Sequence, residues 1–518
     1  MSAAPPDEQY RQWLRRHQPG GVRLDELRAR QRSFGVQPLV SVVVPVRDAR
    51  EEWLDRMAGS LRQQVYQRWE LCIADDGSAA PQVRPWLQQL AAGDSRVQLA
   101  LRDTAGGIAA ASNTAAALAT GEFILLLDHD DLLQPHALHR AVAALQDDPS
   151  VDIVYSDEDK LLLDGRRGMV HFKRDFDPDL LLAGNYLCHF AMYRRSLFET
   201  VGGFREGFEG SQDHDLALRA TERARSVVHI PDVLYTWVQH AGSTALQAGE
   251  KPAAWDAGIR AAQDALNRRG ETAAVVPGPS PGLGMVRRRV DDDLSISLIR
   301  IRRRGTAFAG EAALIAVAGM SIAEIIEVHG EPEPRALNQA AANARGSVLV
   351  FLDSDLLPSG AATPWLRALI EQACRAEVCA AGARVLAADG SSQHEGLHTR
   401  PDVIAEHAGV LWPVIQRVAA VSVSAMAVRR SPFLELNGFE EQFHHALHDV
   451  DYCLRGRRAG LAAIYTPLSE LRRTDATELR SIDSHDAETL RRRWSDTDLR
   501  DPFSSPWVRR LNPYTIDC

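Results

Sequence analysis

Long apolar runs are scarce in this 518-residue sequence. The longest, Leu39–Val46, Phe123–Leu127 and Ala312–Met320, fall short of the roughly 18–20 residues that cross a bilayer. The N-terminal segment also lacks the apolar core that a signal peptide requires. We therefore expect a cytoplasmic protein. A peripheral contact with the inner face of the inner membrane stays open.

Excess positive charge and metal-type cysteine spacing are also lacking. Lys and Arg number 59 against 69 Asp and Glu, a formal net charge of −10, so we expect no nucleic-acid partner. The closest of the six cysteines, Cys374 and Cys379, have no second pair to complete a zinc site, and we interpret them as buried thiols. With 45% hydrophobic and 25% charged residues, the composition is typical of a globular protein.

From Leu39 onward, short apolar runs alternate with segments of helical periodicity, which is typical of βαβ units. The strands that this pattern predicts are Val42–Val44, Leu71–Ile73, Val97–Leu101 and Phe123–Leu127. Helices are expected around 53–61 and 107–119. Buried strands joined by single helices predict a mainly parallel sheet in an α/β domain.

The chain also repeats itself at long range. ILLLDHDDLL from Ile124 returns as LVFLDSDLL from Leu349, and Tyr193–Arg219 returns as Val428–Arg455. A repeat of this length indicates a duplicated domain and not a solenoid. Breaker residues between Gly278 and Val290 predict the joint. The expected divisions are a helical extension at 1–38, a first domain at 39–277, a second domain at 290–490 and a tail at 491–518.

Two acidic clusters follow strands of the first repeat. Asp75 and Asp76 follow one strand, and Asp128-His129-Asp130-Asp131 follows another. A single cluster of this kind is more often a solvated turn, but the carboxyl edge of an open α/β sheet carries the ligand crevice, so two clusters there favour a site. Asp128 and Asp130, with Asp131 nearby, suit a Mg²⁺ ion that also binds substrate phosphates.

A further acidic pair opens a predicted helix in SQDHDLALR. Asp213 and Asp215 are each candidates to take a proton from an attacking hydroxyl, and each is equally a candidate helix cap. His240 follows the strand-like segment Val233–Val238 and is either structural or a contact to metal or phosphate. If the phosphate carries a sugar, this set of side chains suits glycosyl transfer.

The order of these motifs resembles that of family-2 glycosyltransferases of the GT-A fold. The segments that carry the resemblance are VSVVVPVRD, ADDGS, Gly106-Gly107 to Asn113, TGEFILLLDHDD, GGFREGFEGSQDHDLALR and QHAGST. YSDEDK and FDPDLLLAGNYLCHFAMYRR are similar to bacterial enzymes of O-antigen and other surface-polysaccharide assembly. The resemblance implies an α/β protein of two tandem GT-A domains, Rossmann-like, with mainly parallel mixed sheets.

The resemblance also implies an activity. The first domain should move a sugar, with inversion, from a nucleoside-diphosphate-sugar to a saccharide or lipid-linked saccharide acceptor, using Mg²⁺ or Mn²⁺. Inversion by a single displacement needs one base and no carboxylate nucleophile. Asp213 is the implied base, with Gln212 where the family has glutamate. The implied metal ligands are Asp128, Asp130 and His240. The implied nucleotide-sugar contacts are Pro45, Asp48, Asp75, Asp76, Asn113, Asp128, His129 and Gln212. Arg47-Asp48 departs from the Tyr-Asn common in relatives, which leaves the base contacts there open.

The second repeat keeps the aspartates Asp353, Asp355, Asp449 and Asp451. It lacks a counterpart of DDGS, and Arg472-Arg473 stands where a late histidine is expected; a cation beside a divalent metal is electrostatically unfavourable. We expect this domain to be degenerate or specialised for acceptor binding, domain packing or a second transfer. Three alternatives to a sugar transferase with one active domain stay open for the whole protein. They are a bifunctional transferase with both domains active, a non-catalytic nucleotide-sugar-binding scaffold, and an enzyme of nucleotidyl or phosphoryl transfer.

Overall fold

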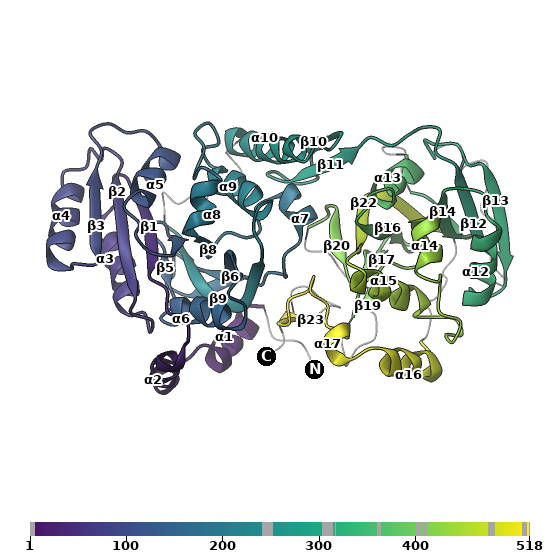
Figure 1. The fold of residues 1–518 in the computed structure, drawn as a ribbon, viewed down its shortest axis with the longest axis horizontal. Coiled ribbons are helices and arrows are strands. Elements are labelled where there is room, and N and C mark those ends of the chain that lie inside the picture. The colour runs from purple at the N-terminus through teal and green to yellow at the C-terminus, as the bar shows by residue number, and fades with distance from the viewer. Residues whose placement is uncertain are drawn as a thin grey trace.

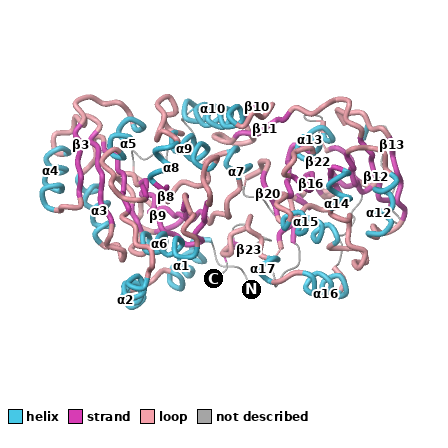
Figure 2. Tube along the Cα trace, viewed as in Figure 1, coloured by secondary structure: helices cyan, strands magenta, loops and turns pink. Residues whose placement is uncertain are grey.

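The computed structural model describes residues 6–240, 252–302, 314–315, 318–359, 364–399, 406–407, 412–474, 482–509 and 515–516. They form two lobes side by side, each with its own sheet (Figure 1). In both lobes, helices cover the strands from outside (Figure 2). Within these ranges, no helix is long and apolar enough to cross a membrane.

The sheet of the first lobe has the order β3-β2-β1-β4-β8-β6-β9-β5, with β7 paired to β6. Its strands are β1 Val40–Val46, β2 Trp69–Asp75, β3 Val97–Leu101, β4 Phe123–Leu126, β5 Leu132–Leu133, β6 Ile153–Leu161, β7 Arg167–His171, β8 Ala191–Arg194 and β9 Val227–Val238. β1 pairs in parallel with β2 and β4, so the carboxyl ends of these strands meet at one edge, whereas β8 runs antiparallel to β4. The sheet is therefore mixed, with a parallel half at its start.

Amphipathic helices pack on this sheet. They are α3 Glu51–Arg62, α4 Val83–Gly93, α5 Ile108–Ala116, α6 Ala137–Asp147, α7 Pro178–Ala183, α8 Arg195–Thr200, α9 Gln212–Thr221 and α10 Pro252–Arg268. In α3, Leu54, Met57 and Leu61 are buried at the predicted helical spacing and join the core formed by β1, β2 and β4. The four strands and two helices predicted from the pattern are all present.

The second lobe repeats the strand order of the first from β2 onward, as β13-β12-β14-β21-β16-β22-β15. Its main strands are β12 Ile296–Arg302, β13 Glu324–His329, β14 Val348–Asp353, β15 Leu356–Pro358, β16 Val378–Leu386, β21 Ala425–Arg429 and β22 Ala462–Arg473. Its short strands are β17 Ser392–His394, β18 Leu397–His398, β19 Glu406–His407 and β20 Gln416–Val418. Its helices are α12 Pro334–Asn343, α13 Trp365–Ala373, α14 Arg430–Glu435 and α15 His448–Arg458. Among the described residues, no strand of this sheet corresponds to β3.

The same internal hydrogen bonds recur in both lobes. The Asn113 amide donates to Phe204 O and accepts from Phe204 N at 2.8 and 2.9 Å, and Asn338 pairs with Phe439 in the same way at 2.8 Å each. Gly203 (φ +64°) and Gly438 (φ +58°) pass beside these amides, where a Cβ atom would strike the amide oxygen. Shared topology and shared bonds confirm two tandem GT-A domains.

A second duplicated contact is an ion pair inside a helix. Arg219 Nη2 lies 2.7 Å from Asp215 Oδ2 and also donates to Gly203 O, while Arg455 pairs with Asp451 and donates to Gly438 O. Asp215 and Asp451 are fully buried. Each buried aspartate therefore holds an arginine that links its helix to the preceding Gly-Phe turn.

The segment around the predicted joint folds as a hairpin. β10 Ala273–Pro277 and β11 Gly284–Arg288 form an antiparallel hairpin, and the breaker residues make its turn. Arg287 of β11 pairs with Glu371 of α13 at 2.7 Å. A packed hairpin, and not an open connector, leads from one lobe into the other.

The N-terminal extension packs on the first lobe and meets Trp507 there, whereas Leu490, Trp494 and Leu499 of the C-terminal helices join the core of the second lobe. The predicted helical extension has two main helices, α1 Pro6–His17 and α2 Gly21–Arg30, with a 3₁₀ turn at Gln31–Ser33. Tyr10 and Trp13 are buried against Val233, and Trp507 lies 5.4 Å from Trp13 between ring centroids. The C-terminal elements are α16 Ser484–Arg493, α17 Asp496–Leu499, β23 Val508–Arg509 and β24 Thr515–Ile516.

Arg219→Met removes one partner of the buried pair with Asp215. Asp215 keeps Arg205 as a second cation, but Val201 O, Gly203 O and one Asp215 oxygen lose their Arg219 donor, so we expect the free energy of unfolding to fall by about 2 kcal/mol. Arg28→Met, which removes an exposed pair with Asp25, should cost less than about 0.5 kcal/mol. Urea unfolding followed by circular dichroism measures both. Equal losses for the two variants would contradict this assignment.

Candidate active site

The acidic loop after β4 is fixed by its last aspartate. Asp131 is fully buried; its Oδ2 accepts from Tyr235 Oη at 2.6 Å and its Oδ1 from Val238 N at 2.8 Å. Both bonds join the loop to β9. Asp131 is thus structural, whereas the side chains of Asp128 and Asp130 keep 44% and 18% of their surface exposed.

The predicted metal ligands Asp130 and His240 lie together. Their Oδ2 and Nε2 atoms are 2.7 Å apart. The His240 ring stacks on Trp53 of α3 at 3.9 Å between centroids, which fixes its orientation. Desolvation raises the pKa of Asp128, and the nearby carboxylates of Asp130 and Asp213 add to the rise, against an opposing effect of His189. Two partly exposed carboxylates and an imidazole are a suitable donor set for a divalent cation.

The two aspartates of the SQDHD segment have different partners. Asp213, in the first turn of α9, accepts from Asn185 Nδ2 and from His214 N, both at 2.9 Å. Asp215 is instead held by Arg219 and Arg205. The N-cap residue of α9 is Ser211, so the capping alternative fits neither aspartate. Asp215 is committed to the fold, and Asp213 is the candidate base.

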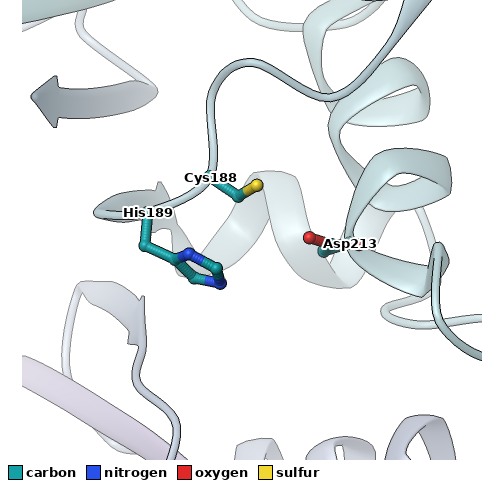
Figure 3. A group of neighbouring side chains, drawn as sticks. All are labelled: Cys188, His189 and Asp213. Atoms are coloured by element: carbon teal, nitrogen blue, oxygen red, sulfur yellow. The ribbon is translucent and has the colours of Figure 1, made fainter. Parts of the chain in front are cut away.

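Asp213 and Asp128 line one cavity. The side chains around it include Pro45, Ser112, Asn185, Cys188, His189, Tyr193, Gln212 and Phe204. Cys188, His189 and Asp213 face one another there, with donor atoms within 4.8 Å (Figure 3). The amide oxygen of Asn185 is buried without a hydrogen-bond partner among the described residues. The cavity thus presents a carboxylate, an imidazole and an unsatisfied amide oxygen to a single ligand.

His189 also lines the cavity, although the sequence motifs did not identify it as a site residue. Its Nε2 lies 4.0 Å from Asp128 Oδ2, its Nδ1 lies 3.5 Å from Glu158 Oε2, and its ring stacks on Tyr235. Burial disfavours the charged imidazole, but Glu158 and Asp128 outweigh it and raise the pKa of His189 to about 9. The NYLCH segment was similar to known enzymes, yet no strand end or spacing singled out Asn185 or His189.

Asp48 and Asp76 join the loops that follow β1, β2 and β3. Asp48 Oδ1 accepts from Ala79 N and Ala80 N at 2.7 and 2.9 Å. The Asp76 oxygens accept from Gly106 N and Gly107 N at 2.8 and 2.9 Å, and Asp76 pairs with Arg102. Since each carboxylate oxygen has two lone pairs, these bonds leave room for a further donor.

Other predicted contacts have structural partners. Asp75 is fully buried and pairs with Arg84 at 2.8 Å. The side-chain amide of Asn113 forms its hydrogen bonds with the backbone of Phe204. Gln212 Oε1 accepts from Gly210 N, and His129 lies 6.3 Å from Trp53 between ring centroids. For these four residues, contact with a nucleotide-sugar stays a prediction.

The second domain has an arginine at the corresponding carboxylates. Arg473 Nη1 lies 2.8 Å from Asp355, and Nη2 lies 3.2 Å from Asp353. Both aspartates are buried, and the arginine side chain is 8% exposed. Asp449, the counterpart of Asp213, accepts from the backbone amides of Val423 and Val450. A guanidinium therefore neutralises the pair that a metal would need.

The comparisons with known proteins agree with this geometry. The model of "Glycosyl transferase family 2" matches residues 41–202. Over 203 residues the chain is 30% identical to the putative glycosyltransferase EpsE of Bacillus subtilis, covering 38% of this chain and 72% of that protein. The chain belongs to glycosyl transferase family 2.

Two relatives extend the family likeness over both domains. The chain is 34% identical to the uncharacterized protein y4gI of Sinorhizobium fredii, over 96% of this chain and 60% of that protein. It is 32% identical to the O-antigen biosynthesis protein RfbC of Myxococcus xanthus, over 84% of this chain and 37% of that protein. The chain thus spans less than two thirds of the length of either.

The raised pKa of His189 predicts a pH-dependent stability. The protonated ring's contribution is complete below its ordinary pKa of 6.5 and is lost as the pH rises to about 9. Relative to His189→Gln, the wild type should therefore lose up to about 3 kcal/mol of unfolding free energy across this interval. Urea unfolding at a series of pH values measures the difference. Parallel profiles for the two proteins would show that His189 is not charged in the folded state.

Proposed function

We propose that the first domain transfers a sugar, with inversion, from a nucleoside-diphosphate-sugar to a hydroxyl of a saccharide or lipid-linked saccharide during assembly of a bacterial surface polysaccharide. The observation that carries this proposal is the shared cavity of Asp128 and Asp213, with the Asp130–His240 pair beside Asp128's loop. Membership of family 2 supports the reaction class. The name of RfbC supports the polysaccharide context.

In this proposal Asp213 is the general base. Asn185 and the His214 amide donate to its two oxygens, which orients the carboxylate and leaves lone pairs for the acceptor hydroxyl. As that hydroxyl attacks the anomeric carbon, its proton passes to Asp213. The bond to the diphosphate breaks in the same displacement, so a second carboxylate is not required.

The leaving group is expected on the Asp128 side of the cavity. Asp128, Asp130 and His240 would hold Mg²⁺ or Mn²⁺, which, when bound, supplies positive charge to the diphosphate. His189 adds a second cation near Asp128. The proposed nucleotide contacts include Pro45 and Gln212, which line the cavity, and Asp48 and Asp76, in the loops after β1 and β2.

The second domain is proposed to carry no transfer site of its own. A divalent ion at Asp353 and Asp355 would have to displace the buried Arg473 guanidinium. This favours a single active centre over the bifunctional alternative. Loss of one specific linkage in Asp353→Ala would instead favour two centres.

Asp213→Asn should lower turnover about 10²-fold or more, because the amide cannot take the acceptor's proton, while donor binding persists. Release of the nucleoside diphosphate in the presence of acceptor measures turnover. Asp449→Asn, at the matching position of the second domain, is the control and should keep full activity. Unchanged turnover in Asp213→Asn would remove this residue from the base role and favour a scaffold.

Asp130→Ala should abolish metal-dependent donor binding. Thermal unfolding with Mn²⁺ and a panel of UDP-, GDP- and dTDP-sugars identifies the donor as the compound that raises the melting temperature. The matched variant Asp355→Ala should respond to that donor and metal as the wild type does. A metal-dependent shift that persists in Asp130→Ala and disappears in Asp355→Ala would place the donor in the second domain.

A further inference from the structure

An apolar core runs without a break from the first domain into the second. Leu181 and Leu182 of α7, with Met285 and Val286 of β11, share one buried cluster with residues of the second domain. Those partners are Val378, Val414, Ile415, Ala462 and Ile464. The helix α7 lies between the lobes, facing β20 (Figure 1). The two lobes are thus packed as one body around α7.

The N-terminal end of α7 is held by arginines of the second domain. Asp179 is 5% exposed and pairs with Arg375 Nη1 at 2.7 Å and with Arg417 Nε at 3.2 Å. The helix N-cap, Asp177, is fully buried, and its Oδ2 accepts from Arg417 N at 2.9 Å. We call Asp177, Asp179, Arg375 and Arg417 the interdomain clamp.

The clamp leaves the carboxylate of Asp179 dependent on the second domain for its ion pairs. Burial would raise the pKa of Asp179, but Arg375, Arg417 and Arg288 outweigh it and hold that pKa well below its usual range. Burial and the adjacent Asp179 raise the pKa of Asp177. Arg174 of the first domain also faces Asp177, at 3.4 Å, and donates to Arg417 O. Without Arg375 and Arg417, Asp179 would have no ion-pair partner among the described residues.

The other end of α7 leads directly into the candidate active site. Its helical residues end at Ala183, and Asn185, two residues later, donates to the base Asp213 at 2.9 Å. Leu181 O of α7 also lies 2.6 Å from His214 Nε2, next to that base. A helix of six residues spans only about 9 Å, so a shift at the clamp moves Asn185.

We propose that the second domain acts as a positioning element for the transfer reaction of the first. Arg375 and Arg417 fix the start of α7, and α7 sets Asn185 against Asp213. Asp213 touches the reacting hydroxyl, whereas the two arginines act only through the helix. The second domain would then have a role in the reaction although Arg473 pairs with its own aspartates, Asp353 and Asp355. The kinetic part rests on the proposed function above, and the structural part does not.

The structural part is tested by hydrogen–deuterium exchange of the full chain. Arg417→Met keeps the aliphatic stem and removes the charge at a side chain that is 25% exposed. Peptides covering 178–190 should then exchange about tenfold or more faster than in the wild type, and Arg417→Lys should recover part of the protection. Arg384→Met is the matched control, since Arg384 is 31% exposed and pairs with two carboxylates inside the second domain. It should leave exchange in 178–190 unchanged.

Arg375→Met is a second test of the same clamp. If it does not fold, Arg417→Met decides alone. Wild-type exchange over 178–190 in folded Arg417→Met overturns the proposal. So does equal loss of protection in Arg384→Met, because that would reflect general destabilisation of the second domain.

The kinetic part is tested with the donor found by thermal unfolding. In Arg417→Met, turnover should fall about tenfold or more while the donor KM stays within twofold, since misplacement of a catalytic group slows the chemical step. Arg417→Lys should restore turnover in part. A raised KM with unchanged kcat contradicts positioning of the base. If the wild type turns over no donor, the proposed function fails, and the exchange experiment still decides whether the clamp orders 178–190.

Discussion

Repulsion between carboxylates gathered at one edge of a sheet is the constraint on which this site depends. Each aspartate that belongs to the fold has its own donors: Tyr235 and Val238 N for Asp131, and two arginines for Asp215. The remaining aspartates, Asp128, Asp130 and Asp213, face the cavity or its rim. The fold thereby separates structural from reactive carboxylates within single motifs, and concentrates uncompensated negative charge where a cation and a diphosphate are expected.

The two domains differ in the groups that lie beside their matching aspartate pair. Their folds share the Asn–Phe amide pairing and the Asp–Arg pair within a helix, so the scaffold has been kept. At the aspartate pair after the fourth strand, the first domain has His240 and an exposed Asp128, whereas the second has the buried guanidinium of Arg473. An arginine cannot be deprotonated in a protein and cannot bind a metal, so the change is one of chemistry and not of architecture.

Much of the fold could be predicted because it depends on local patterns. Buried strands, amphipathic helices and the duplicated segments follow from apolar periodicity and self-similarity, which is why β1, β2, β3 and β4 lie where they were predicted. The acidic clusters were found for the same reason. What the pattern could not separate was Asp130 from Asp131 or Asp213 from Asp215. Their difference lies in partners outside the acidic segments, Tyr235 of β9 for Asp131 and Arg205, before α9, for Asp215, whose contacts appear only in the folded chain.

The same reason explains what was missed. Asn185 and His189 follow no strand end, and their roles appear only when α9 and the loop after β4 are brought beside them. The breaker residues marked the joint but not its hairpin, because Gly and Pro mark turns equally well inside a hairpin and between domains. The interdomain clamp could not be predicted from the sequence. An Asp-Pro-Asp segment at the start of a helix predicts an N-cap, and this prediction is the same whether or not arginines of another domain contact the aspartates.

The energetics of the clamp indicate why it serves geometry more than stability. Taking two carboxylates and two guanidinium groups out of water costs most of what their attraction returns, so a buried ion network adds little net free energy of folding. Its directional hydrogen bonds, however, allow only a narrow set of positions for Asp177 and Asp179. The apolar core around Leu181 and Ile415 holds the two domains together. The charged groups fix the position of α7 relative to the second domain. In this arrangement the apolar contacts decide that the domains associate, and the ion pairs decide where the end of α7, and with it Asn185, comes to rest.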